Sequence, residues 1–210
     1  MKKIYLLNNL SFNNIENLEV FKIRYIKKDI DFSKYDAIIF TSKNAVYSID
    51  SFSSDWKKIP CYAIAPKTAK IIESLNGKVE YIGKSGHGND YAKELINHLE
   101  NKKTLYLRAS KTVSNLISIL KENKINIDDE IIYETICNDE LKKRDFELNS
   151  IFIFTSPSSV ECFFKKFNWH DSFTAIVIGN TTAKFLPNEV DFFVSSSTSV
   201  EECVKLAQKL

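Results

Sequence analysis

Two segments of the chain, 36–70 and 150–184, look like two copies of one structural device, and this repeat constrains the fold more than any other feature. A shift of 114 positions, the difference between Phe154 and Phe40, aligns them without a gap. It superposes an apolar run, a Thr-Ser pair and a second hydroxyl-bearing turn. The aligned pairs are Phe40/Phe154, Ser42/Ser156, Val46/Val160, Ile64/Ile178, Ala69/Ala183 and Lys70/Lys184. An internal repeat of this kind predicts two similar structural units.

Short runs rich in Ile, Val, Phe and Tyr alternate along the chain with stretches of helical periodicity. The predicted strands are 3–7, 22–26, 36–40, 60–64, 79–82, 104–107, 131–136, 151–154, 174–178 and 190–194. The predicted helices are 43–51, 67–75, 90–99, 112–121, 157–167, 181–186 and 199–210. This alternation predicts an α/β fold with parallel sheets covered by helices on both faces. From the duplication alone we expect two five-stranded units of about 100 residues each, divided near residue 100.

The composition excludes several classes of protein. Of the 210 residues, 44% are hydrophobic, which is enough for real cores and excludes a disordered chain. The 29 basic and 27 acidic side chains nearly balance, so the electrostatic signature of a nucleic-acid binder is missing. The chain enters a strand-like run at Lys3 without the apolar stretch of a signal peptide, and no window has the length of a membrane span. We therefore expect a soluble cytoplasmic protein.

The four cysteines, Cys61, Cys137, Cys162 and Cys203, lie far apart in the sequence, without metal-ligand or redox-motif spacing. We expect all of them to be small buried thiols in a reducing cytosol. The three histidines are also scattered, so the sequence predicts no metal site.

Hydroxyl-bearing turns follow the predicted strands in both copies. Thr41-Ser42 and Thr155-Ser156 come directly after strands, where a serine can cap the next helix. Capping alone would explain each pair. However, ligands of open parallel sheets bind at the carboxyl ends of strands, and helix N-termini there attract anions. Repeated turns of this type therefore favour an anionic ligand held by amides and hydroxyls.

The second turn of each copy, Ala65-Pro-Lys-Thr68 and Gly179-Asn-Thr-Thr182, repeats this pattern. Neither turn is a Walker loop or a dinucleotide fingerprint, so nucleotide binding has no motif support. The glycine-rich segment Gly83-Lys-Ser-Gly-His-Gly88 follows a later strand, and we expect a mobile loop there rather than a phosphate-binding one.

Groups for acid-base or nucleophilic catalysis are not evident, because no Ser/His/Asp set can be assembled. Tyr133 lies in a half-polar predicted strand, where a tyrosine is usually a packing residue. Arg108 ends the strand Leu105–Leu107, where it could pair with a ligand carboxylate or lie on the surface as an ordinary arginine.

Five motifs in order resemble uroporphyrinogen-III synthases and cover nearly the whole chain. They are Phe40-Thr-Ser, Ala63-Ile-Ala-Pro-Lys-Thr-Ala69, Leu107-Arg108 with Ile132-Tyr-Glu-Thr135, Phe154-Thr-Ser-Pro157 and Ile178-Gly-Asn-Thr-Thr-Ala183. Departures from the family pattern include Asn8-Asn9 where many members have Arg-Pro, and Ala109 where a glycine often follows the arginine.

The resemblance implies two flavodoxin-like parallel-sheet domains joined by a two-stranded antiparallel connection, with a ligand cleft between them. Carried over, residues 1–24 with 137–210 form one domain and 25–136 the other, which differs from a division near residue 100. Family members also suggest a monomer.

The resemblance further implies an enzyme that closes the linear tetrapyrrole hydroxymethylbilane to uroporphyrinogen III, with loss of water and inversion of ring D, and without cofactor or metal. Tyr133 takes the position of a tyrosine proposed to help the hydroxyl leave as water. The residues expected to bind the eight carboxylates are Thr41, Ser42, Thr68, Arg108, Ser156, Thr181 and Thr182. The rival interpretation is a non-catalytic two-lobed binding protein for a small polyanion; a domain of a regulatory protein is a third.

Overall fold

The computed structural model describes residues 2–210, and these divide into two compact units. Unit 1 combines the residues up to Lys22 with Thr135–Leu210, and unit 2 is Ile23–Glu134. The chain therefore passes from one unit to the other twice. The domains carried over from the family are residues 1–24 with 137–210 and residues 25–136. That these ranges are domains that move or fold separately stays a prediction.

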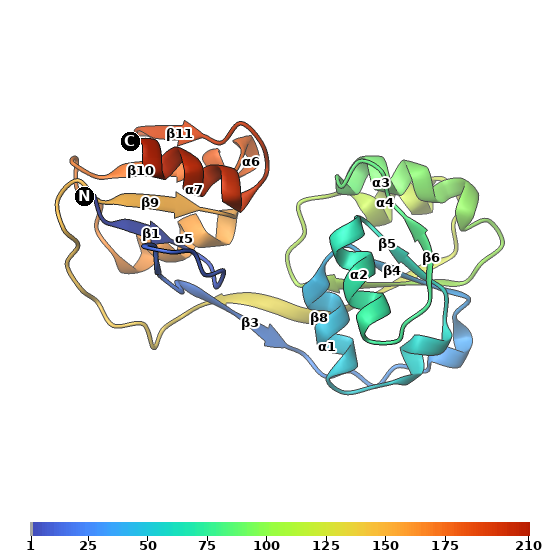
Figure 1. The fold of residues 1–210 in the computed structure, drawn as a ribbon. Coiled ribbons are helices and arrows are strands. Elements are labelled where there is room, and N and C mark those ends of the chain that lie inside the picture. The colour runs from blue at the N-terminus through green and yellow to red at the C-terminus, as the bar shows by residue number, and fades with distance from the viewer. Residues whose placement is uncertain (1) are drawn as a thin grey trace. The chain divides into compact units, whose positions relative to one another are not determined.

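Unit 1 contains a five-stranded sheet in which every pair of neighbours is parallel. In spatial order its strands are β11 (Phe192–Val194), β10 (Thr174–Val177), β9 (Ile151–Phe154), β1 (Ile4–Leu6) and β2 (Glu16–Asn17). Its helices are α5 (Pro157–Lys166), α6 (Asn180–Ala183) and α7 (Val200–Lys209). Helices α5 and α7 pack on opposite faces of the sheet, in two separate clusters of buried side chains (Figure 1).

Unit 2 contains a six-stranded sheet. In spatial order its strands are β3 (Phe21–Tyr25), β8 (Ile127–Cys137), β7 (Thr104–Ala109), β4 (Ala37–Phe40), β5 (Cys61–Ala63) and β6 (Val79–Ile82). Helices α1 (Lys43–Asp50) and α2 (Pro66–Ser74) cover one face, and α3 (Gly88–Leu95) and α4 (Leu116–Glu122) cover the other. Short 3-10 turns lie at Phe32–Lys34, Asp55–Lys58 and Ile96–His98.

The predicted α/β class with two parallel sheets is confirmed. Unit 1 has the flavodoxin-like strand order, in which the second strand of the unit lies at one edge beside the first. Five strands of unit 2 have the same arrangement in space, but β7 and β8 come after β4, β5 and β6 in the chain. Strand β2 was not predicted from the sequence; it has two residues and lies in a polar segment.

The nearly unbroken apolar runs form the central strands, as strands covered on both faces should. All residues of β4 and β9 are 0% exposed. Residues that alternate along these strands contact different helices: Ile38 and Phe40 face α1 and α2, whereas Ala37 and Ile39 face α3 and α4. Full burial of each large apolar side chain stabilises the fold by about 1.5–3 kcal/mol.

The prediction of four free thiols was wrong for two of the cysteines. Cys137, the last residue of β8, forms a disulfide with Cys162 of α5, and their Cα atoms are 5.2 Å apart. No spacing signal marks this pair in the sequence, because the two residues are 25 positions apart and are brought together by the packing of α5. Cys61 and Cys203 are free and buried, as predicted.

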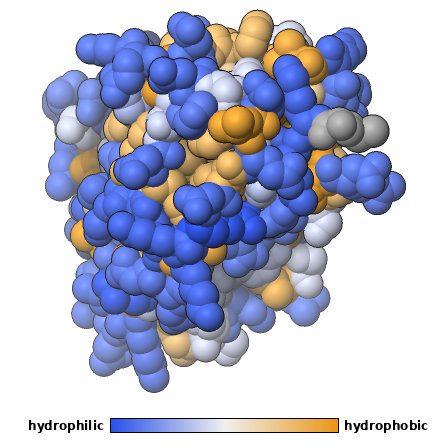
Figure 2. All heavy atoms as spheres, turned by 90° about the vertical axis from the view of Figure 1, so that its left-hand side faces the viewer, coloured by the Kyte–Doolittle hydropathy of each residue, from blue (hydrophilic) through white to orange (hydrophobic). Residues whose placement is uncertain are grey.

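The surface is predominantly hydrophilic on the face of the molecule that Figure 2 shows, and apolar side chains lie between blue ones. Exposed large apolar residues do occur, and three of them form the edge strand β11, namely Phe192, Phe193 and Val194. Among residues 2–210, no helix combines the length and the apolar character needed to cross a membrane.

Candidate functional site

The carboxyl ends of the parallel strands of unit 2 bring five predicted site residues to the same edge of the sheet. The register aligns the ends of β4, β5 and β7, and β8 continues past the end of β7. Thr41 and Ser42 follow β4, Thr68 lies in the first turn of α2 after β5, and Arg108 and Tyr133 lie on β7 and β8. This edge is where open α/β sheets bind ligands.

Ser42 caps α1. Its hydroxyl oxygen accepts a hydrogen bond from the Asn44 amide at 3.1 Å, which confirms the predicted capping role. The hydroxyl hydrogen is not used in this bond, so Ser42 keeps one donor for another group. Thr41 is fixed separately, because its Oγ1 lies 2.8 Å from the hydroxyl oxygen of the buried Tyr106. Tyr106 was not recognised in the sequence, where it reads as an ordinary apolar strand residue.

Tyr133 lies beside this turn and is 8% exposed. Burial raises the pKa of its phenol above the ordinary value, and a hydrogen-bonding interaction with the Ser42 side chain works in the opposite direction. The net pKa is raised, so the phenol keeps its proton at neutral pH. A protonated phenol at a ligand-binding edge can act as a proton donor, although its ring also packs in the core beneath α1 and α2.

Arg108 has partners of its own in the structure. Its Nε donates to Asp129 Oδ2 at 2.7 Å, and its Nη1 donates to the Ala109 carbonyl oxygen at 2.9 Å. Asp129 was not recognised as this partner from the sequence. With the guanidinium tied to the neighbouring strand, a ligand carboxylate would meet an oriented cation that has donors to spare. Whether Arg108 binds one stays a prediction.

Thr68 is 6% exposed, and its amide donates to the Ala65 carbonyl oxygen within the first turn of α2. Pro66 occupies the first position of the helix and has no amide hydrogen to offer. The hydroxyl-bearing turn therefore exists as predicted, with the Thr68 side chain buried and the neighbouring Lys67 exposed.

In unit 1, Ser156 occupies the place of Ser42. It forms a full capping box with Ser159, in which the Ser159 amide donates to Ser156 Oγ and the Ser156 amide donates to Ser159 Oγ, both at 3.2 Å. Pro157 begins α5, as predicted. Ser156 thus has the same double capacity as Ser42, since it caps a helix and presents a hydroxyl hydrogen at a strand end.

Thr181 and Thr182 lie in the short helix α6 after β10. Thr181 is exposed, whereas Thr182 is 3% exposed and its amide donates to the Gly179 carbonyl oxygen at 3.0 Å. Gly179 has an extended backbone, and a Cβ there would make only an ordinary contact with Thr198 at 3.5 Å. The neighbouring residues therefore leave room for a larger side chain at this position.

The backbone amides of the loop predicted at 83–88 form hydrogen bonds with the carboxylate of Glu94. The amides of Lys84 and Ser85 donate to the two carboxylate oxygens of Glu94 at 3.0 and 3.3 Å, and the Tyr81 hydroxyl donates to the same group. Although desolvation opposes it, these hydrogen bonds lower the pKa of Glu94. Because Glu94 belongs to α3, these hydrogen bonds fix the loop against that helix.

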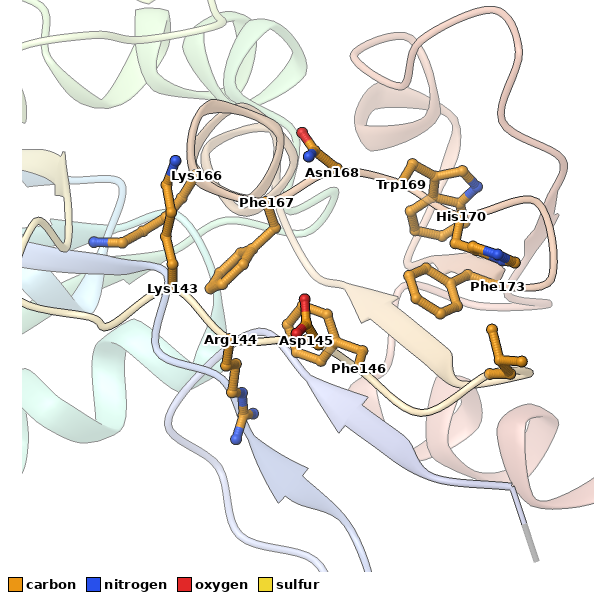
Figure 3. A pocket seen from close by; sticks show the side chains of 11 residues that line it. Lys143, Arg144, Asp145, Phe146, Lys166, Phe167, Asn168, Trp169, His170 and Phe173 are labelled. Atoms are coloured by element: carbon orange, nitrogen blue, oxygen red, sulfur yellow. The ribbon is translucent and has the colours of Figure 1, made fainter.

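A pocket of about 490 Å³ lies elsewhere in unit 1 (Figure 3). Phe146, Phe167, Trp169 and Phe173 line it, and it opens beside the segments that lead into β9 and β10. It therefore lies toward the amino ends of these strands, away from Ser156. Two of its cations are engaged: Lys166 donates to the carbonyls of Asn138 and Asp139, and Arg144 pairs with Glu16 at 2.6 Å. The predicted residues do not line this pocket.

Within residues 2–210, no group of three or more His, Cys, Asp and Glu side chains is arranged to hold a metal ion. The polar groups at the strand ends are instead hydroxyls, helix-start amides, one arginine and one buried phenol. This set can bind carboxylates and can deliver a proton.

Comparisons with known proteins agree with the motifs. The family model described as "Uroporphyrinogen-III synthase HemD" matches residues 16–204. A crystal structure of uroporphyrinogen-III synthetase from Helicobacter pylori 26695 is similar with a TM-score of 0.85 and 30% sequence identity, over 100% of this chain and 99% of that one. No curated protein matches in a sequence search.

A mutant uroporphyrinogen III synthase from the extremely thermophilic bacterium Thermus thermophilus has a TM-score of 0.56 at 13% identity, over 100% of this chain and 97% of that one. At this identity the similarity shows the fold alone.

Proposed function

Because this chain belongs to the uroporphyrinogen-III synthase family and closes hydroxymethylbilane to uroporphyrinogen III in haem biosynthesis, we propose how its residues carry out that reaction. The observation on which the proposal depends is a buried tyrosine with a raised pKa, Tyr133, beside the hydroxyl of Ser42 at the carboxyl edge of a parallel sheet.

Tyr133 is the proton donor. Its phenol gives a proton to the hydroxymethyl oxygen, the carbon–oxygen bond breaks with both electrons on oxygen, and water leaves. The substituted α-carbon of ring D attacks the resulting azafulvene and forms a spiro intermediate. The bond from this carbon to the bridge of ring C then breaks, the free α-carbon of ring D bonds to that bridge instead, and the proton which that carbon loses returns to the phenolate. Burial keeps the phenol in its protonated form at neutral pH, so the proton that it donates is present at the start of every turnover.

The strand ends of each unit bind substrate carboxylates. In unit 2 the binding residues are Thr41, Ser42, Thr68 and Arg108, and in unit 1 they are Ser156, Thr181 and Thr182. Hydroxyls and helix-start amides suit carboxylates, because they offer donors without requiring a matching cation for each charge. Holding several carboxylates at once orients the reacting rings, which is how binding energy is converted into rate. The enzyme works without a cofactor, as a monomer in the cytoplasm.

The test is to supply hydroxymethylbilane made in situ and to resolve the isomers of uroporphyrinogen by chromatography. We expect the type III isomer with the protein and the type I isomer without it, because uncatalysed closure does not invert ring D. Only type I product in the presence of folded protein would reject the reaction.

The rival interpretation, a non-catalytic binding protein for a small polyanion, is separated by the same assay together with a binding measurement. Such a protein would bind uroporphyrinogen in calorimetry and leave the isomer ratio at its uncatalysed value.

A further inference from the structure

Strand β8 is irregular at the point where it carries Tyr133. Arg108 and Ala109 are consecutive on β7, yet the residues opposite them on β8 are Ile131 and Tyr133. Ile132 is therefore an extra residue without a partner in this ladder, which is a β-bulge. Bulges of this kind change the direction in which the following side chain points.

The bulge decides which face of the sheet Tyr133 lies on. Neighbouring residues of a regular strand point to opposite faces, and β7 follows this rule, with Leu105 and Leu107 on the side of α1 and Tyr106 on the side of α3. Ile132 and Tyr133 break it, because they lie together in the cluster beneath α1 and α2. The irregularity thus brings the phenol to the side of α1, where Ser42 is.

The backbone of the bulge is fixed by a side chain of α1. The carbonyl oxygen of Ile132 accepts a hydrogen bond from Ser48 Oγ and a second one, at 2.8 Å, from the amide of Ile26. Ser48 is 0% exposed and lies among apolar side chains, where an isolated hydroxyl would be unfavourable without a partner. Helix α1 therefore contacts β8 through two serines: Ser42 meets the phenol, and Ser48 holds the peptide just before it.

We propose that Ser48 is a positioning residue of the cyclisation reaction, which acts by holding the Ile132 bulge so that the Tyr133 phenol faces the Ser42 turn; this rests on the proposed role of Tyr133. Ser48 does not touch the substrate. Its effect therefore falls on turnover by the phenol and not on binding of the carboxylates.

A purely structural role for Ser48 predicts something different. Removing the hydroxyl leaves the Ile132 carbonyl with the amide of Ile26, so the fold survives in either case. If Ser48 only stabilised the fold, the folded variant would turn over substrate at the original rate. If it positions Tyr133, folded protein turns over more slowly at an unchanged KM.

The experiment compares Ser48→Ala with Ser51→Ala. Ser51 follows α1, and its hydroxyl donates to the Ser48 carbonyl oxygen at 2.6 Å, so its removal also takes one serine hydroxyl bond from this helix without touching β8. We expect kcat for the type III isomer to fall about tenfold in Ser48→Ala, with KM within about twofold, because small misplacements of reacting groups are costly. Ser51→Ala keeps the original kcat, and Ser48→Thr, which retains a hydroxyl, recovers most of the activity.

A double-mutant cycle separates this proposal from the role of Tyr133. If Ser48 acts through the phenol, adding Ser48→Ala to Tyr133→Phe causes no further loss of kcat. A multiplicative loss, or an unchanged kcat in folded Ser48→Ala, would overturn the proposal while the Tyr133 assignment stands. Full activity of Tyr133→Phe would instead remove the assignment of Tyr133. Should Ser48→Ala not fold, Ser48→Cys, with a weaker donor, takes its place, and an unchanged kcat there also rejects the proposal.

Discussion

Units 1 and 2 have the same arrangement of five strands but differ in the strand at one end of it. In space, β2-β1-β9-β10-β11 of unit 1 corresponds to β8-β7-β4-β5-β6 of unit 2. The turns with Ser156 and Ser42 follow equivalent strands in this correspondence. At one end of this arrangement, however, β2 is an edge strand of two residues, whereas β8 has 11 residues, lies between β7 and β3, and carries both the bulge and Tyr133.

This difference separates two tasks. The features that both units share, hydroxyl caps at strand ends, suit the repeated carboxylates of a tetrapyrrole. The feature that only unit 2 has, a buried phenol presented by an irregular strand, suits a step that happens once in each turnover. We therefore propose that the duplicated parts bind and the unique part reacts, and the following predictions test that division.

Replacing Tyr133 with phenylalanine should have the largest effect. We expect a fall in kcat for the type III isomer of about 10²-fold or more, which is typical for loss of a general acid. The free energy of unfolding should change little because the ring still packs. Tyr91→Phe is the control, since the hydroxyl of Tyr91 is buried on the opposite face of the sheet without a hydrogen-bond partner among residues 2–210. Equal kinetics in these two variants would remove the distinction between the units.

The pH dependence gives a second measure of the same residue. Burial raises the pKa of Tyr133, so the proton-donating form persists through neutral pH and is lost only as pH rises above the ordinary tyrosine value of about 10. We expect the rate in the original chain to decline in that alkaline range, and the residual rate of Tyr133→Phe to lack this decline. A phenol that titrates near neutral pH would contradict the assignment.

Reducing the disulfide should destabilise unit 1 specifically. Closing a loop of 25 positions stabilises a fold by about 3 kcal/mol, so dithiothreitol should lower the free energy of unfolding by about that amount. Cys137→Ser should show the loss without reductant and no further loss with it. Thiol titration checks the pairing: the denatured, unreduced chain should show two thiols, Cys61 and Cys203, and four would exclude the disulfide.

The two capping serines should show the smallest effects, and these should differ in kind. Ser42→Ala and Ser156→Ala each lose a helix cap, at a cost of about 1 kcal/mol of stability. Because Ser42 is also beside Tyr133, its removal should lower kcat, whereas removal of Ser156 should raise KM only. Steady-state kinetics at saturating substrate distinguishes these outcomes, and identical changes in both variants would argue against a reacting unit and a binding unit.

The parts of the fold that follow from local patterns could be predicted. Apolar runs such as 151–154 became buried parallel strands, and Ser42 and Ser156 became helix caps, because both outcomes depend on residues close in sequence. The repeat also explains why a division near residue 100 was wrong for the compact units. The sheet of unit 1 combines β1 and β2 from the first half of the chain with β9, β10 and β11 from the second half. The sheet of unit 2 combines β4, β5 and β6 from the first half with β7 and β8 from the second half. The halves of the sequence and the compact units therefore do not coincide.

Features that depend on distant residues could not be predicted. The pairing of Cys137 with Cys162 depends on how α5 packs, and the partner of Arg108 is an aspartate on the next strand. The face of the sheet on which Tyr133 lies depends on the bulge at Ile132, and the alternation of residues in the sequence gives no sign of this bulge. It also depends on Ser48, which looks in the sequence like any small residue of a helix. Local propensity does not determine these features, because they are set by packing between distant segments.

The exchange of strands between the two halves also affects how the protein is made. All of unit 2 is contiguous in the chain, so it has been synthesised in full before most of the second part of unit 1, Thr135–Leu210. Strand β1 is synthesised early, but its partner β9 follows only after unit 2 is complete. The side chains of Tyr5, Leu6 and Leu7, which are buried in the folded protein, therefore stay exposed to solvent until β9 has been synthesised. At this stage of synthesis a nascent chain of this topology most needs protection from aggregation.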